Sequence, residues 1–183
     1  MATRYMEIPE PPLAKYLFSS TKIAWFWLLI RVYVGWQWLE AGREKLGNPA
    51  WTGAQAGAAV KGFLTGALTK ASGAHPDVSS WYAYLIQHVG LPHATLISHL
   101  VVYSEIIIGL ALIFGLFTGL AAFLGSFMNL NFLFAGTVSI NPLLALLELF
   151  LILAWRVAGF YGLDQIVLPA LGTPWQKGKL FKS

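Results

Sequence analysis

The sequence of 183 residues contains no cysteine. A disulfide framework, a thiolate-ligated metal or iron–sulfur centre and a thiol nucleophile are therefore excluded. Charge is also scarce, because Lys, Arg, Asp and Glu together make up 11% of the residues. The few basic residues are dispersed and flank apolar runs, which indicates attraction to lipid headgroups rather than binding of nucleic acid.

Recognised catalytic and cofactor motifs are missing as well. The histidines at positions 75, 88, 93 and 99 follow no known metal-site spacing, so we expect neither a metal ion nor haem. There is no Walker loop, Rossmann glycine motif, nucleophile elbow or HExxH. No motif supports a stand-alone cofactor-dependent enzyme.

Apolar residues, by contrast, are abundant. They make up 57% of the chain, and the mean hydropathy is +0.63, which is typical of an integral membrane protein. The run at 98–136 is too long for one membrane crossing and is interrupted by FGLFTG, which predicts a tight helical hairpin in lipid. We predict an all-α membrane protein with a bundle of four transmembrane helices, spanning about 22–46, 93–116, 118–138 and 142–161.

Three further segments accompany these spans. We expect residues 1–21 to form an N-terminal interfacial segment before a membrane domain at 22–164, and residues 165–183 to form a C-terminal interfacial tail. A structureless loop as long as 48–92 would be unusual, so we predict amphipathic helices there that cover one mouth of the bundle. The aromatic residues of this cover fit a lid over a site and a headgroup-anchoring hairpin equally well.

An even number of spans places both termini on the same side of the membrane. Basic residues are more numerous on the side of the termini, which favours cytoplasmic termini and a cover that lies outside. The residues counted with the termini are Arg4, Lys15, Lys22, Arg156, Lys177, Lys179 and Lys182, against Arg43, Lys45, Lys61 and Lys70 on the other side.

Polar side chains inside the predicted spans are the candidates for function. Arg31 and Glu105 both fall near the membrane midplane, where an isolated charge is costly, so we expect them to pair or Glu105 to be protonated. Such a pair either takes part in chemistry or only fixes the register of two helices. Other polar residues could converge on a cavity open to the outside or act as hydrogen-bond glue between helices: Gln37, Glu40, His99, Tyr103, Asn129, Asn131 and Glu148.

Four stretches of the chain are distinctive when taken together: RVYVGWQWLEAGREKL (31–46), SEIIIGLALIFGLFTGLAA (104–122), MNLNFLFAGTVSINP (128–142) and WRVAGFYGLD (155–164). Through them the chain resembles the DoxX-like family of four-helix membrane proteins, and more closely the branch that includes the DoxD subunit of thiosulfate:quinone oxidoreductase. The resemblance implies a compact four-helix bundle in a prokaryotic cytoplasmic membrane. Because one fold serves many functions, it implies less about chemistry.

If the resemblance extends to activity, thiosulfate is oxidised to tetrathionate and a membrane quinone accepts the electrons. On the chemistry of the side chains, we would then expect Arg31 and Glu105 to be catalytic. Quinone or substrate would be bound by Arg43, Lys45, His99, Tyr103, Asn129, Asn131 and Glu148. Since the chain has no redox centre of its own, a partner membrane or peripheral subunit, or a tightly bound quinone, would carry the electrons. The alternative is a non-catalytic accessory subunit of a larger respiratory or photosynthetic complex. The sequence is compatible with a homo-oligomer, and transport of a small solute is poorly supported by four spans.

Overall fold

A computed structural model of the chain describes residues 9–172, which contain helices and no strand. The N-terminal part comprises α1 (Pro12–Ser19), the 3-10 turn η1 (Thr21–Ile23) and the long helix α2 (Ala24–Leu46). The other elements are α3 (Ala58–Thr69), α4 (Ser80–Leu85), the π-helical turn η2 (Ile86–Gly90), α5 (Ala94–Phe114), α6 (Thr118–Phe134), α7 (Asn141–Leu153), α8 (Trp155–Ala158) and α9 (Asp164–Leu171). Residues 1–8 and 173–183 lie outside the described part. They include four of the basic residues counted on the side of the termini: Arg4, Lys177, Lys179 and Lys182.

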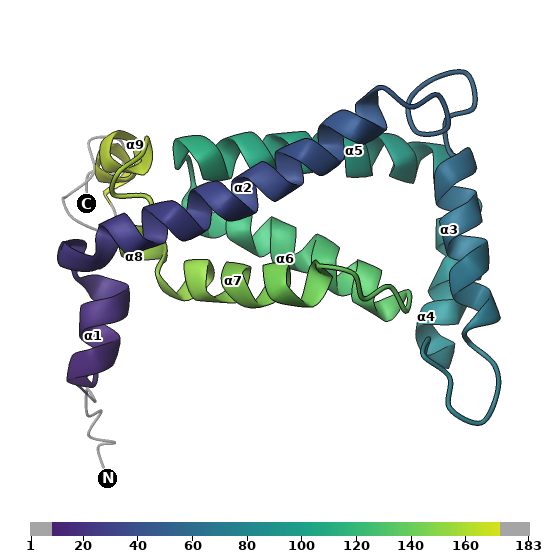
Figure 1. Ribbon diagram of the computed structural model, residues 1–183, viewed down its shortest axis with the longest axis horizontal. Helices are drawn as coiled ribbons and strands as arrows, with labels where there is room; N and C mark the ends of the chain where they lie inside the picture. The colour runs from purple at the N-terminus through teal and green to yellow at the C-terminus, as the bar shows by residue number, and fades with distance from the viewer. Residues whose placement is uncertain (1–8, 173–183) are drawn as a thin grey trace, which may run out of the picture.

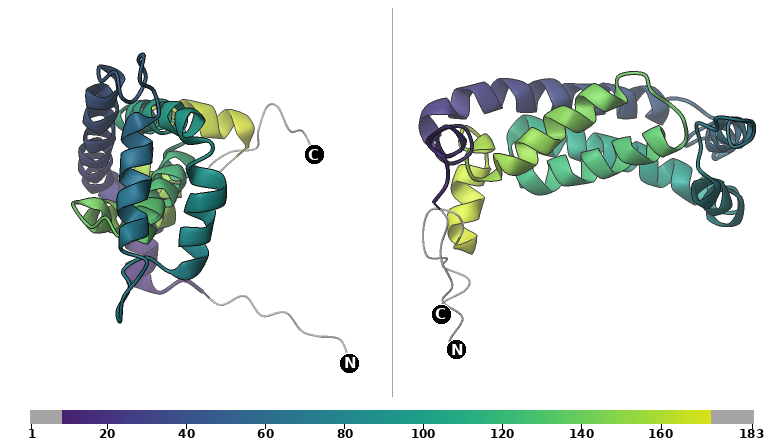
Figure 2. Two further views of the ribbon diagram at one scale, coloured as in Figure 1. Left: turned by 90° about the vertical axis from the view of Figure 1, so that its right-hand side faces the viewer. Right: turned by 90° about the horizontal axis from the view of Figure 1, so that it is seen from below.

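Helices α2, α5, α6 and α7 run along the long axis of the molecule and form a bundle (Figure 1). Helix α2 packs along α5, and α6 packs along α7. Helix α1 crosses one end of this bundle and the pair α3 and α4 crosses the other, as Figure 2 also shows. Helices α1 and α9 lie at the same end, so the first and last described residues are on one side of the bundle.

Glycines allow the closest contact in the bundle, between α2 and α5. A Cβ atom added to Gly109 would lie 2.6 Å from the backbone nitrogen of Leu39, and one added to Gly35 would lie 2.9 Å from the carbonyl oxygen of Gly109. Small residues of this kind let two helix backbones approach in a membrane bundle. This contact fixes the antiparallel register of α2 against α5.

The turn between α5 and α6 contains two residues with left-handed backbone conformation. Gly115, at the end of α5, has φ +67°, and Phe117, just before α6, has φ +47°. The turn corresponds to the interruption FGLFTG in the long apolar run. The expected hairpin therefore forms between Phe114 and Thr118.

Two apolar clusters hold the fold together. The larger lies between α2, α5, α6, α7 and α8 and is built around Trp27, Trp38, Leu112 and Leu151. The smaller joins the cover to the end of the bundle, where Val60, Leu64, Val78 and Ile86 pack against Ala94 and Ala135. The cover is therefore docked on the bundle by its own core.

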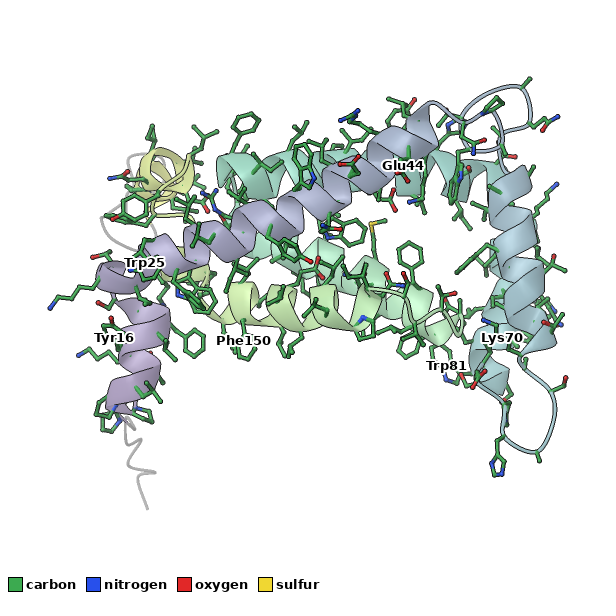
Figure 3. All side chains as sticks on the ribbon, in the orientation of Figure 1. Tyr16, Trp25, Glu44, Lys70, Trp81 and Phe150 are labelled. Atoms are coloured by element: carbon green, nitrogen blue, oxygen red, sulfur yellow. The ribbon has the colours of Figure 1, made fainter. Side chains whose placement is uncertain are left out.

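Large apolar side chains also face outward along the whole bundle. Trp36, Ile107, Phe123 and Leu146 are each at least half exposed, one on each bundle helix. Tyr16 and Trp25 lie near one end, Trp81 lies near the other, and Phe150 points away from α7 between them (Figure 3). Aromatic residues at both ends of an apolar surface are typical of the two membrane interfaces.

The four long helices differ in their fitness to cross a membrane. Among the described helices, α5 alone is long and apolar enough by itself, and α1 with η1 and α2 passes only as a pair bent by 60°. Helices α6 and α7 are apolar but shorter. The helix expected over 118–138 ends at Phe134, and the one expected over 142–161 is interrupted at Ala154.

Candidate functional site

A cavity of about 600 Å³ lies beneath the cover, between α3, α4 and η2 and the ends of α5 and α6. Its wall is mostly apolar, with Phe63 and Leu64 from α3, Ile86 from η2, and Met128 and Phe132 from α6. Ligand sites in proteins are commonly concave, of this size and largely apolar, with a small number of placed polar groups. The cavity therefore has the form of a site for a mainly apolar molecule.

Tyr82 and Asn131 form one polar wall of this cavity. The Tyr82 hydroxyl donates to the Asn131 carbonyl oxygen at 3.0 Å, with Asn131 Oδ1 at 3.2 Å, and Asn131 Nδ2 donates to the Phe127 carbonyl oxygen at 2.8 Å. Burial raises the pKa of the Tyr82 hydroxyl above its ordinary value, so this group remains a donor at neutral pH. One N–H of the Asn131 amide is left for a ligand, because Nδ2 has two hydrogens.

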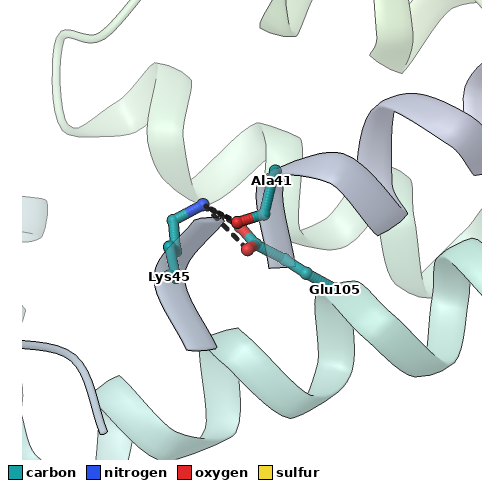
Figure 4. Close-up of polar contacts among 3 residues, drawn as sticks. All are labelled: Ala41, Lys45 and Glu105. Atoms are coloured by element: carbon teal, nitrogen blue, oxygen red, sulfur yellow. Dashed lines mark hydrogen bonds and ion pairs between the residues drawn. The ribbon is translucent and has the colours of Figure 1, made fainter. Parts of the chain in front are cut away.

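Lys45 supplies the charged part of the cavity wall. Its Nζ lies 2.7 and 2.8 Å from the two carboxylate oxygens of Glu105, and the Ala41 carbonyl oxygen is 3.5 Å away (Figure 4). The Trp51 ring, whose centroid is 5.3 Å from Nζ, adds a cation–π contact. A hydrogen bond of 3.5 Å is near the outer limit, so the third N–H of Lys45 can serve a better acceptor.

Glu105 is 1% exposed, and its charge partner is Lys45, one residue before the end of α2. The expected pairing of Glu105 with Arg31 is therefore wrong. Arg31 packs against Gly115, which lies ten residues further along α5, about 15 Å at 1.5 Å per residue. Its Nη2 donates instead to the Tyr161 carbonyl oxygen at 3.1 Å.

At that other end of the bundle, Asp164 joins two turns of the chain. Its carboxylate accepts hydrogen bonds from the backbone N–H groups of Phe117, at 2.6 Å, and Thr118, at 2.9 Å. Its own backbone N–H donates to the Gly115 carbonyl oxygen at 2.7 Å, and its charge attracts the Arg31 guanidinium. Arg31 and Asp164 thus fasten the segment before α9 to the α5–α6 turn.

A third polar group lies inside the bundle. Glu148 of α7 is 0% exposed and accepts hydrogen bonds from Trp38 Nε1 at 2.5 Å and from Asn129 Nδ2 at 2.8 Å. Gly125 of α6 makes room for it, since a Cβ atom there would collide with Glu148 Oε1. Neither Glu148 nor Asn129 lines the cavity.

The geometry can now be compared with known proteins. The profile of the DoxX family matches residues 26–137, more than half of the chain, from α2 through the cover to the end of α6. The chain belongs to the DoxX family. It is therefore a membrane protein, and its outward apolar surface faces lipid. No curated protein and no solved structure matches it.

In this DoxX chain the residues expected to bind a ligand are divided between several places. Lys45 and Asn131 line the cavity, with Glu105 behind Lys45. Arg43 is exposed on α2, and His99 stacks on Tyr103, with ring centroids 6.2 Å apart, away from the cavity. Within residues 9–172, no group of three or more His, Asp or Glu side chains is placed to hold a metal ion.

Sequence reasoning overlooked Trp51, Tyr82, Trp38 and Asp164 as polar partners. Trp51 and Tyr82 are among the aromatic residues of the predicted cover and Trp38 lies in the first predicted span, but none of them is predicted to have a role of its own. The N–H or O–H of a buried Trp or Tyr usually finds an acceptor, which is the signal that could have revealed Trp38 and Tyr82. Asp164 follows a glycine-rich turn, and nothing in the sequence marks its partners at Phe117 and Thr118.

Proposed function

We propose that this DoxX chain is a membrane subunit of a quinone-linked redox system and that its cavity beneath the cover holds the quinone ring. The observation that supports the proposal most is the composition of the cavity wall: apolar side chains over about 600 Å³ and hydrogen-bond donors at two separate places. A quinone is a flat, apolar ring with two carbonyl oxygens that accept hydrogen bonds. The residues present fit this group.

Each donor has a definite role in the proposal. Lys45 offers its third N–H to one carbonyl oxygen, and Glu105 and Trp51 hold its ammonium group in position. Asn131 offers its remaining N–H at the other wall, while Tyr82 orients the amide through Oδ1. A bound quinone supplies two-electron, two-proton redox chemistry. The mostly apolar wall of the cavity strengthens hydrogen bonds to the ligand, because the local dielectric constant is low.

Asn131→Leu tests the second donor. This change removes the amide but keeps the backbone carbonyl oxygen that accepts from Tyr82, so the cover should stay docked. We expect the Kd for a short-tailed quinone analogue, followed by quenching of the protein's tryptophan fluorescence, to rise about tenfold, which corresponds to about 1.4 kcal/mol. Arg43→Gln is the matched control, because Arg43 is exposed and outside the cavity. Equal affinity of Asn131→Leu and the unaltered protein would contradict the assignment.

The electron donor in this proposal is thiosulfate, as in the DoxD subunit that the sequence resembles. Two thiosulfate ions joined by a new S–S bond give tetrathionate and two electrons, which balances the reduction of one quinone. Because this chain has no cysteine, we propose that a partner subunit binds the sulfur compound and passes on the electrons. If the purified protein binds quinone but membranes that contain it do not reduce quinone when thiosulfate is added, the quinone site is retained and thiosulfate is excluded as the electron donor. A chain that neither binds quinone nor supports its reduction would be an accessory subunit.

We further propose that all four bundle helices span a prokaryotic cytoplasmic membrane, with both termini cytoplasmic. Helix α6 is about 26 Å long and α7 with α8 about 27 Å, which a slightly thinned bilayer accommodates. Helix α1, with Leu13 and Tyr16 exposed, then lies along the inner surface. The cover formed by α3 and α4 lies outside.

The absence of cysteine makes this topology directly testable by labelling. Ser72→Cys is in the exposed loop between α3 and α4, and Lys15→Cys is on the exposed face of α1. In intact cells, we expect a membrane-impermeant maleimide to label Ser72→Cys almost completely and Lys15→Cys only after permeabilisation. The reverse pattern would place the cover inside, and labelling of both in intact cells would show that α2 does not cross the membrane.

A further inference from the structure

Glu148 is a buried carboxyl group that the proposed quinone site does not use. Both of its oxygens have partners, but these are neutral N–H groups, from Trp38 on α2 and Asn129 on α6. Within residues 9–172 neither Lys, Arg nor His forms an ion pair with Glu148. It differs in this from Glu105, whose charge Lys45 balances, and from Asp164, which is attracted to Arg31.

The side-chain oxygen of Asn129 is the second unusual feature of this part of the bundle. Asn129 Nδ2 donates to Glu148, but Asn129 Oδ1 is buried and has no hydrogen-bond partner. A buried polar atom without a partner is costly and calls for an explanation. An amide can present an N–H donor to a carboxylate or, turned over, a carbonyl oxygen to the O–H of a carboxylic acid. Asn129 therefore has a partner for Glu148 in either protonation state.

We propose that Glu148 is a proton-binding site within the bundle, and that it takes up and releases its proton as the Asn129 amide turns over. In the charged state Glu148 accepts from Trp38 and Asn129. In the neutral state its O–H donates to Asn129 Oδ1, while Trp38 still donates to the other carboxyl oxygen. The groups that face Glu148 are thus Trp38 from α2 and Asn129 and Gly125 from α6, none of which titrates near neutral pH.

The position of this site connects it with the cavity. Trp38 lies seven residues before Lys45 on the same face of α2, about 10 Å deeper in the bundle. Asn129 directly follows Met128, which lines the cavity. The proton site and the cavity therefore lie near each other along both α2 and α6. The inference concerns the proton alone, so it holds or fails independently of the quinone proposal.

Infrared spectroscopy of the purified protein in lipid, without added quinone, tests the proposal. A protonated carboxyl group has a C=O stretching band apart from the carboxylate bands. We expect such a band to grow as the pH is lowered, to be lost in Glu148→Gln and to remain in Glu105→Gln. Spectra of the unaltered protein and of Glu148→Gln that show the same pH dependence would overturn the proposal.

Trp38→Phe provides a second variant in case Glu148→Gln does not fold. It removes one hydrogen bond to the charged carboxylate and keeps the aromatic ring in the core. Because a donor to the charged form favours that form, its loss favours the acid. We expect the midpoint of the band's titration to rise by about one to two pH units, the equivalent of one charge-assisted hydrogen bond. An unchanged midpoint would contradict the proposal.

Discussion

Lys45→Met is expected to lower the free energy of unfolding by about 3–5 kcal/mol, because it leaves the charge of Glu105 buried and unpaired. Glu105 is 1% exposed, and both of its oxygens depend on Lys45 for their hydrogen bonds. The measurement is the unfolding transition of the purified protein in mixed micelles. Lys61→Met is the control, since it removes an exposed lysine of the cover and should change the unfolding free energy by less than about 0.5 kcal/mol.

The double variant Lys45→Met with Glu105→Leu separates stability from ligand binding. Replacing both members of a buried ion pair with apolar residues is often neutral, so we expect the double variant to unfold within about 1 kcal/mol of the unaltered protein. We nevertheless expect the double variant to bind the quinone analogue more weakly than the unaltered protein does, because it lacks the Lys45 donor. A double variant that is as unstable as Lys45→Met would show that Glu105 is not stabilised mainly through this pair. A double variant that binds quinone as tightly as the unaltered protein would show that Lys45 does not bind the quinone.

The fold could be predicted from the sequence to the extent that it depends on long apolar runs and strong turn signals. Helices α2 and α5 begin and end within two residues of the expected spans. Lys22 and Pro92 precede their first residues, and Gly47 and Gly115 follow their last. The end of α6 differs from the prediction by four residues. The helix ends at Phe134 because the backbone of Gly136 has φ +69°, and the N–H of Gly136 donates to the carbonyl oxygen of Leu133 at 2.9 Å. A glycine in this position is a common local signal for the end of a helix, but the apolar character of the run favoured a longer span. The packing of Ala135 under the cover, by contrast, has no local signal in the sequence.

The candidate site, too, could be predicted only in part from the sequence. That Glu105 needs a partner follows from its place in an apolar run, but depth alone does not identify the partner. Arg31 and Glu105 were each placed by counting from a membrane edge, which treats α2 and α5 as straight and perpendicular to the membrane. The register set by Gly35 and Gly109 instead brings Arg31 to the end of α5. The lysine side chain is long enough to reach back by one helical turn, so Lys45 meets Glu105 although it lies near the end of α2.

Asp164→Ala should have an effect as large as that of Lys45→Met, but at the other end of the bundle. The change leaves the N–H groups of Phe117 and Thr118 without an acceptor at the buried start of α6, and it removes the charge that attracts Arg31. Loss of a cap costs about 1 kcal/mol, and an uncompensated buried charge adds several more. We therefore expect a loss of about 3–5 kcal/mol in the unfolding free energy, measured in the same mixed micelles.

The chain offers a matched control for this change in Glu10, an acidic residue at the same end of the bundle that forms an exposed ion pair. Its pair with Arg156 has an N–O distance of 3.4 Å, and both side chains are about half exposed, so Glu10→Ala should cost less than about 1 kcal/mol. Asp164→Ala should leave the affinity for the quinone analogue unchanged, because the cavity lies at the opposite end of α5. If Asp164→Ala lowers the unfolding free energy no more than Glu10→Ala does, the hydrogen bonds of Asp164 to the start of α6 contribute little to stability. If it weakens quinone binding in a folded protein, the ligand site extends to the Arg31 end, and the assignment of the cavity beneath the cover would have to be given up.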